Sequence, residues 1–245
     1  MDQMVTMPDL HEHTLKKYER ELKRLRATLV EMGGRVESQL DSAVQSILKR
    51  DATVATAAIE SDPTVDALEH DVEQFIIRLF ALRQPMADDL RHIVAALKIS
   101  NALERAGDLS ANIAKRSLIL SQFRTSVNLV GLEGIARLVQ KNLKSVVDAI
   151  EEDDATKAIG VWNDDKAIDD FYTVIFREQI TYMIEDPRNI TPCAHLLFVA
   201  KNLERIGDLA TNIAEMVHYA VTGTALSGAR PKGITLVDPD TLDAS

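Results

Sequence analysis

The chain has 245 residues, a formal net charge of −10 and an apolar content of 46%. That length supports a real core in one large domain or two modest ones, and the apolar content excludes disorder throughout. The acidic balance speaks against general nucleic-acid binding, which needs a basic surface. Aromatic residues make up only 4%, and a core rich in Ala and Leu favours helices over sheets.

The cysteine content and the hydropathy bear on the compartment. Cys193 is the only cysteine, which excludes an intramolecular disulfide and suits a reducing cytoplasm. The N-terminal stretch lacks the apolar segment of a signal peptide, and no apolar run approaches the ~18 residues of a membrane span. The sequence therefore suits a cytoplasmic protein, which would act at a membrane only by docking.

In chain order, apolar spacings of three and four residues predict helices over about 10–50, 52–84 and 86–121. The pattern then repeats over about 132–151, 155–185 and 189–222. Pro85 and Pro187 lie at equivalent places, between the second and third predicted helices of each set. The chain after residue 223 is rich in Gly, Pro, Ser and Thr, which predicts a disordered tail.

The two sets of helices are copies of one unit. "NALERAGDLSANIA" (101–114) and "KNLERIGDLATNIA" (201–214) agree at nine of fourteen positions, offset by 100 residues. "ILKRDATVATAAIESDPTVD" (47–66) aligns with "IEEDDATKAIGVWNDDKAID" (150–169) at an offset of 103. The period is too long for a solenoid. We therefore predict an all-α fold of two tandem, pseudo-symmetric three-helix bundles, 1–124 and 125–222, followed by a tail, 223–245.

Each copy contains two pairs of carboxylates four residues apart, which places each pair on one face of its helix. Like charges at this spacing destabilise a helix by roughly 0.2–0.5 kcal/mol per pair, and cations can compensate. Oxygen ligands without paired His or Cys suit Mg²⁺, Ca²⁺, Mn²⁺ or iron better than structural zinc. The candidate metal ligands are Asp62, Asp66, Glu104 and Asp108 in the first copy, and Asp165, Asp169, Glu204 and Asp208 in the second.

Simpler explanations of these residues stay open. A charged helix face is often only solvated. Asp62 before Pro63 fits a helix start, and Asp164 could cap a helix in the same way. Gly107 and Gly207 cost ~1 kcal/mol against Ala in a helix, and close helix packing explains them better than room for a ligand.

The residues that carry the repeat resemble the PhoU family of phosphate-signalling proteins. The resemblance rests on 81–116, 182–215 and "DDKAIDDFY" (164–172), and extends over roughly 10–222. It implies two tandem three-helix bundles, and multinuclear metal clusters held by E/D-x-x-x-D motifs in some members. Those motifs fall on the eight candidate ligands, and Mg, Mn, Fe and Zn are the candidate ions. The residues beside the motifs differ between the copies: Glu69 and Glu73 of the first copy are replaced by Tyr172 and Phe176 in the second. Equal metal content in the two halves is therefore not expected.

The resemblance also implies a function. PhoU-like proteins are negative regulators of phosphate uptake and of the phosphate-starvation response. They link the ATPase subunit of the phosphate ABC transporter to a membrane sensor histidine kinase, and no catalysis is required. A cytoplasmic homodimer that docks both machines by its helical faces is the implied arrangement.

Two alternatives belong to other classes. A carboxylate-bridged di-iron enzyme needs paired Glu-x-x-His motifs, and here only Glu215 to His218 matches. A metal-free helical adaptor would use the acidic faces to bind a basic partner directly. No phosphate-binding loop of the GxxxxGK[ST] type occurs, and Cys193 and His195 lie two residues apart, a poor nucleophile–base geometry.

One basic segment stands out from the acidic chain. "LKKYERELKRLR" (15–26) holds six basic and two acidic residues. It is either a solvated helix face or a docking surface for an anionic membrane or acidic partner. Replacing Lys16, Lys23 and Arg24 with Gln would separate these interpretations.

Overall fold

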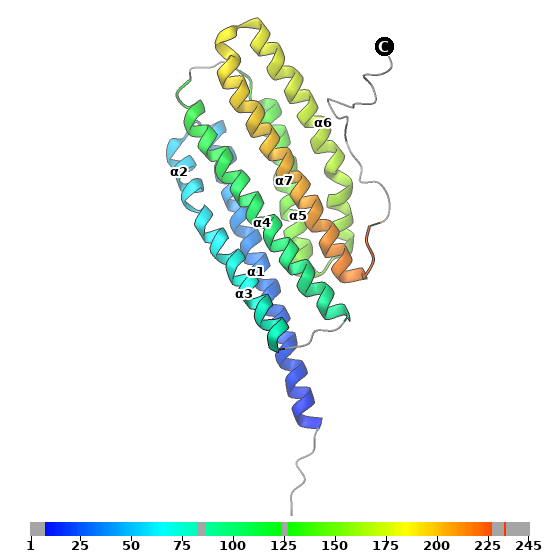
Figure 1. Cartoon of the computed structure of the whole chain (residues 1–245). Helices are drawn as coiled ribbons and strands as arrows, with labels where there is room; N and C mark the ends of the chain where they lie inside the picture. The colour runs from blue at the N-terminus through cyan, green and yellow to red at the C-terminus, as the bar shows by residue number, and fades with distance from the viewer. Residues whose placement is uncertain (1–7, 83–86, 124–126, 227–232, 234–245) are drawn as a thin grey trace, which may run out of the picture.

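The computed structural model describes residues 8–82, 87–123, 127–226 and 233. Its helices are α1 (Pro8–Leu48), α2 (Ala52–Glu60), α3 (Asp62–Leu82), α4 (Ala87–Leu120), α5 (Val130–Glu152), α6 (Ala155–Glu185) and α7 (Ile190–Thr222), with a 3-10 turn at Pro187–Asn189. The all-α prediction is confirmed in the described residues. The six predicted helical segments are present, with the second divided at Ser61 (Figure 1). Pro85 and most of the predicted tail lie outside the described residues.

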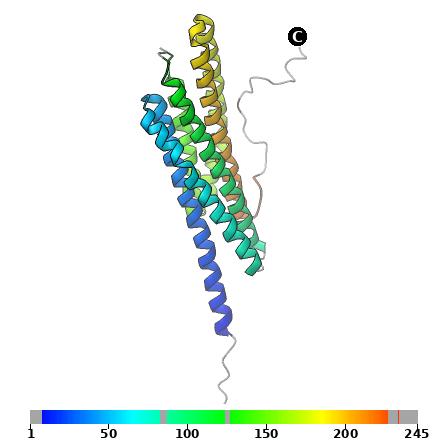
Figure 2. The same cartoon turned by 60° about the vertical axis from the view of Figure 1, so that its left-hand side comes forward.

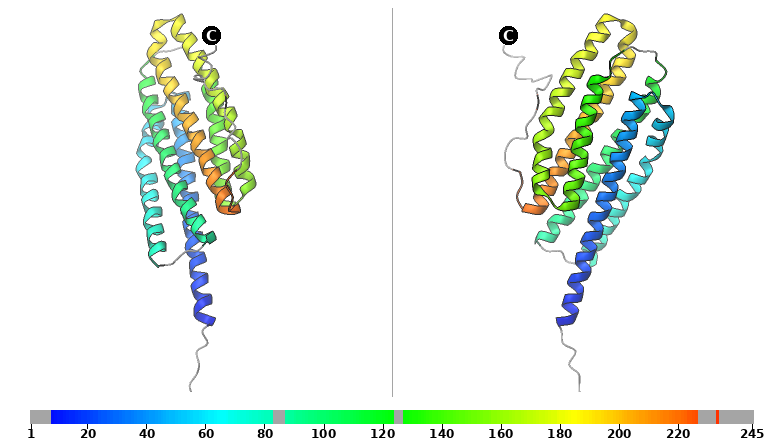
Figure 3. Two further views of the ribbon diagram at one scale, coloured as in Figure 1. Left: turned by 45° about the vertical axis from the view of Figure 1, so that its right-hand side comes forward. Right: turned by 180° about the vertical axis from the view of Figure 1, so that it is seen from behind.

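The helices form an elongated assembly with a central layer. α1 packs along α4 and α5, and α4 and α5 each pack along α7. α2 and α3 cover the α1–α4 side of this layer, while α6 covers the α5–α7 side. Figures 1 and 3 show the arrangement from the front and from behind. The first half is thus α1–α4 and the second is α5–α7.

Both halves contribute to one continuous hydrophobic core. Fully buried side chains include Met32 and Leu103 from the first half, and Leu143, Ile168 and Leu203 from the second. The apolar stripes of α4 and α7 face each other, which explains why these helices lie side by side. The repeated units therefore bury a shared interior rather than two separate ones.

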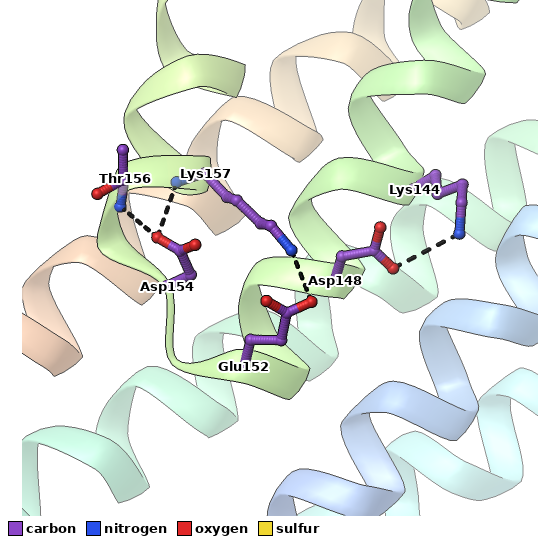
Figure 4. Close-up of polar contacts among 6 residues, drawn as sticks. All are labelled: Lys144, Asp148, Glu152, Asp154, Thr156 and Lys157. Carbon is purple, nitrogen blue, oxygen red and sulfur yellow. Dashed lines mark hydrogen bonds and ion pairs between the residues drawn. The ribbon is translucent and has the colours of Figure 1, made fainter.

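The start of the second helical segment is the same in both halves. Asp51 accepts hydrogen bonds from the amides of Thr53 (2.9 Å) and Val54 (3.2 Å), and so begins α2. Asp154 begins α6 by accepting from the amides of residues 156 (2.8 Å) and 157 (3.1 Å), as Figure 4 shows. The residues before both caps, Arg50 and Asp153, have φ of 53° and 52°. The repeated Asp-Ala-Thr is therefore a helix N-cap.

The path of the chain then differs between the halves. α2 ends at Glu60, and α3 begins at Asp62 with Pro63 in its first turn, as the Asp-Pro pair predicts. α6 runs without a break through the equivalent position, so the idea that Asp164 caps a helix is wrong. Asp164 instead pairs with Lys141 at 2.8 Å. The interruption follows from proline, which removes a helical N–H donor and clashes with the preceding turn.

α1 is the longest helix and extends past the rest of the bundle at its N-terminal end (Figures 1 and 2). Among the described residues, no helix combines the length and the apolar character that crossing a membrane requires.

Candidate functional site: two unequal acidic faces

The first acidic face joins the start of α3 to the middle of α4. Asp62 and Asp66 come from α3, and Glu104 and Asp108 from α4. The pKa of Asp66 is raised by burial and then by the charges of Asp62 and Asp108. The pKa of Glu104 is raised by burial and then by Asp108, Asp66 and further carboxylates. The predicted pairs therefore lie together on one face.

Two further residues complete this face. Glu69, one turn beyond Asp66, has a pKa raised by burial and then by Glu73. Asn101 of α4 donates to Glu69 at 2.6 Å. Behind the face, the buried side chain of Gln39 on α1 donates to Asp62 at 2.9 Å and to the carbonyl of Ala58 at 3.2 Å. Gln39 thus fixes the Asp62 carboxylate from the core side.

The second acidic face has the same positions in different surroundings. Asp165 is only 2% exposed and accepts a hydrogen bond from the Thr211 hydroxyl at 3.0 Å. Its equivalent Asp62 is half-buried. Thr211 has no hydroxyl counterpart in the first half, where Ala111 occupies its place. The buried Asp165 carboxylate is therefore held inside the bundle, turned away from a surface cation.

Lys201 changes the charge of the second face. It binds Glu204 at 2.7 Å and lies over the Tyr172 ring, with Nζ 5.1 Å from the ring centre. Burial raises the pKa of Glu204 more strongly than Lys201 lowers it, so the carboxylate sits in a poorly solvated place. In the first half, the positions equivalent to Lys201 and Tyr172 are occupied by Asn101 and Glu69. The second face thus carries its own cation.

Gly233 also contacts the second face. The Gly233 amide donates to Asp169 at 2.9 Å. A Cβ on Gly233 would lie 2.4 Å from the Cβ of Asp169 and 2.9 Å from a carboxylate oxygen of Asp170. The close approach requires glycine, and it brings a backbone donor onto a residue of the D-x-x-x-D motif.

The two glycines of the repeat serve packing. A Cβ on Gly207 would lie 2.8 Å from the Cδ1 of Ile168, and one on Gly107 would lie 3.1 Å from the Oε1 of Gln39. Both glycines are buried. They let α4 and α7 approach the helix that carries the D-x-x-x-D motif, which is the packing role that the sequence favours.

The fit of a metal ion differs between the halves. No group of three or more His, Cys, Asp or Glu side chains in the described ranges is already arranged to hold a metal ion. The first face offers several carboxylates whose negative charges repel one another, and carboxylate oxygens are ligands that suit hard cations. The second face has one carboxylate buried against Thr211 and another paired with Lys201. The first face fits a cation better.

Other residues singled out from the sequence have structural partners. Glu215 accepts from the Trp162 indole at 3.1 Å, and His218 Nδ1 lies 3.1 Å from the carbonyl of Thr224. Cys193 is buried, and burial raises the pKa of its thiol, which disfavours a thiolate nucleophile. His195 Nδ1 instead contacts Arg116 at 3.2 Å. These contacts favour a non-catalytic role for all of them.

The basic segment of α1 is described only in part, because the side chain of Lys16 lies outside the described residues. Lys23 and Arg24 are exposed. The Arg24 guanidinium lies 5.3 Å from the centre of the Phe75 ring. This contact with α3 gives Arg24 a packing role as well as a charge.

Sequence reasoning missed three residues that define the faces: Gln39, Thr211 and Lys201. Gln39 and Thr211 act across helices, so helical spacing within one segment gives no signal for them, whereas Lys201 lies one turn before Glu204 on the same helix and could have been found from that spacing. Comparing the two copies could have found Lys201 and Thr211, since they align with Asn101 and Ala111 of the first copy. Such differences between otherwise matching copies mark where the halves have diverged.

Comparison with known proteins finds relatives that match nearly the whole helical bundle. The family model described as "PhoU domain" matches twice, at residues 29–117 and 132–217. A phosphate-specific transport system accessory protein PhoU homolog of Caulobacter vibrioides is 51% identical over 222 residues, 90% of this chain and 96% of that protein. The corresponding homolog of Rhizobium meliloti is 44% identical, over 91% of this chain and 94% of its own length. The crystal structure of PhoU from Pseudomonas aeruginosa superposes with a TM-score of 0.82 at 38% identity, covering 84% of this chain and all of that one.

Proposed function

Because the chain belongs to the PhoU family, we propose that it serves a phosphate-specific transport system as a regulatory accessory protein that restrains phosphate uptake and the phosphate-starvation response. The observation that carries the proposal is the match of both halves to the family, at 51% identity to a relative named for that system. A non-catalytic role agrees with the packing of Cys193, His195 and Glu215 described above.

The proposed mechanism is that of an adaptor. The protein acts in the cytoplasm as a homodimer and docks to the ATPase subunit of the phosphate ABC transporter and to a sensor histidine kinase. The long helices support this role, since α1, α4 and α7 are 41, 34 and 33 residues long. Under ample phosphate the docked adaptor favours the repressing state of the kinase. Light scattering on the purified protein tests the dimer.

We further propose that the first acidic face, formed by Asp62, Asp66, Glu104 and Asp108, takes up a divalent or iron-type cation. The neighbouring carboxylates support this, because a cation would relieve the repulsion that, after burial, raises the pKa of Asp66 and Glu104. The second face binds a cation more weakly, because Lys201 already supplies positive charge there. The cation would neutralise the face and so change which partner segments it accepts.

A pull-down at high and low phosphate tests the adaptor. The wild type should capture the ATPase subunit and the kinase, and Glu104→Gln/Asp108→Asn should alter capture more than the paired change at Glu204 and Asp208. Glu133→Gln/Asp148→Asn removes two charges from α5, where both side chains make ordinary i,i+4 pairs, and is the matched control. Equal capture by all four proteins would contradict a role for the acidic faces.

Metal analysis and melting temperature separate the metal-binding adaptor from the metal-free one. Added Mn²⁺ or Mg²⁺ should raise the Tm of the wild type and leave that of Glu104→Gln/Asp108→Asn unchanged. No bound metal and no shift in the wild type would favour the metal-free adaptor, whose first face meets a basic partner directly.

A further inference from the structure

The central layer of α1, α4, α5 and α7 carries a pocket at each end. The first, which we call the Arg26 pocket, is lined by Arg26, Ala96, Ile150, Asp153 and Ala220 among others, and has a volume of about 190 Å³. The second, the Arg50 pocket, is lined by Ile47, Arg50, Leu120, Leu129 and Leu196 among others, and has a volume of about 20 Å³.

The two pockets are equivalent under the sequence repeat. The offset of 103 residues relates Ile47 to Ile150 and Arg50 to Asp153. The same offset relates Arg26 to Leu129, and the offset of 100 relates Ala96 to Leu196 and Ala220 to Leu120. The same site thus exists twice, open at one end of the layer and closed at the other.

Side-chain size explains the difference. Leu196 and Leu120 are 3% and 9% exposed, so both side chains fill the Arg50 pocket. Ala96 and Ala220, at the equivalent positions, are 5% and 7% exposed and leave that space empty of side chain. An unfilled apolar space forfeits dispersion contacts and destabilises a core. Leucine occupies both equivalent positions of the Arg50 pocket, so we expect leucine to fit the Arg26 pocket too, and the alanines to keep it open at a loss of stability.

The lining defines the chemistry of an occupant. The walls are apolar, and the polar groups are the ion pair of Arg26 with Asp153 together with Asp89 and His92. Arg26 and Asp153 side chains are 36% and 39% exposed, so they stand at the mouth. A dry engineered cavity of about 150 Å³ admits benzene. The Arg26 pocket is therefore large enough for a ring-sized apolar body with a polar group at the mouth.

We propose that the Arg26 pocket is a binding site for a small organic molecule, with a ring-sized apolar body inside and one hydrogen-bonding group at Arg26 and Asp153. Such a molecule contacts α1 and α4 of the first half and α5 and α7 of the second. It would fasten the halves together, independently of the acidic faces and of the adaptor function.

Phenol and benzene are the probes, applied to the full chain. Phenol at about ten times its Kd should raise the Tm by about 3 °C. It should bind roughly fivefold more tightly than benzene, which corresponds to one hydrogen bond at the mouth. In methyl NMR spectra, phenol should shift the Ile150 signal and leave that of Ile47, the equivalent residue of the closed pocket, unchanged.

Four variants complete the test. Ala96→Leu or Ala220→Leu should abolish phenol binding and keep or raise the Tm without ligand, and either one suffices if the other fails to fold. Leu196→Ala should open the Arg50 pocket and add a shift at Ile47. Arg26→Gln should retain benzene binding but lose the preference for phenol. Unsaturable binding to the wild type, or binding that survives both leucine substitutions, would overturn the proposal.

Discussion

Exchanging the residues at positions 101 and 201 should change the stability of the two halves in opposite directions. Asn101 and Lys201 are equivalent in the repeat, and the Leu-Glu-Arg of the motif lies two residues beyond each. Asn101→Lys places a cation three residues before Glu104, where it replaces the amide that binds Glu69 beside the carboxylates of the first face. Lys201→Asn removes the cation that binds Glu204 at 2.7 Å. The first change should stabilise the protein and the second should destabilise it.

The burial of the pair sets the magnitude. The side chains of Lys201 and Glu204 are 39% and 12% exposed, so the pair lies between a surface ion pair and a buried one. Exposed pairs contribute about 0.2–1 kcal/mol, and breaking a buried pair costs about 3–5 kcal/mol. We expect Lys201→Asn to cost about 1–2 kcal/mol, which lowers the Tm by about 2–8 °C for a chain of this size. Asn101→Lys should gain about 0.2–1 kcal/mol, which raises the Tm by about 0.4–4 °C.

Calorimetry at neutral pH, with and without Mn²⁺, measures both effects. Lys201→Asn should create a response to Mn²⁺ in the second face, whereas Asn101→Lys should weaken the response of the first. Lys141→Asn breaks the exposed pair with Asp164 and is the control, with an expected loss below about 1 kcal/mol. Tm changes of the same sign for both exchanges would refute the reasoning that the faces differ in charge compensation.

Three further predictions concern single contacts. The pKa of Glu104 is raised, so its ionisation opposes folding: the penalty is absent below the unfolded pKa of about 4.3 and develops as pH rises through the folded pKa. Glu104→Gln should therefore raise the Tm at pH 7 and leave it unchanged at pH 4, as thermal melts across this range would reveal. Asp51→Ala and Asp154→Ala each remove a helix cap and should lower the free energy of unfolding by about 0.5–2 kcal/mol in urea titrations, while Asn at either position should restore it. Thr211→Val keeps the shape but removes the donor to Asp165, and should cost about 1–3 kcal/mol in the same titrations; Thr211→Ser, which keeps the hydroxyl, should cost less.

The sequence predicts the helices well because each is a local pattern. The segment expected over 155–185 is α6 to the residue, and the break near Pro63 follows from proline chemistry. The repeat also places Asp62, Asp66, Glu104 and Asp108 on neighbouring helices, and the structure brings them together. What the sequence does not predict is how deep each carboxylate lies. That depth depends on the rotation and spacing of helices, which Gly107 and Gly207 set through contacts between segments.

Duplication explains why the site consists of two faces, and divergence explains why they are unequal. A regulator with two equivalent faces would bind the same cation or partner segment twice. Here the second face carries Lys201 and Thr211, which bind Glu204 and Asp165 from within the protein. The Arg26 and Arg50 pockets have diverged in the same manner, with leucine filling one and alanine leaving the other open. In both cases the protein's own side chains occupy more of one copy than of the other, so external ligands should act first on the first acidic face and on the Arg26 pocket.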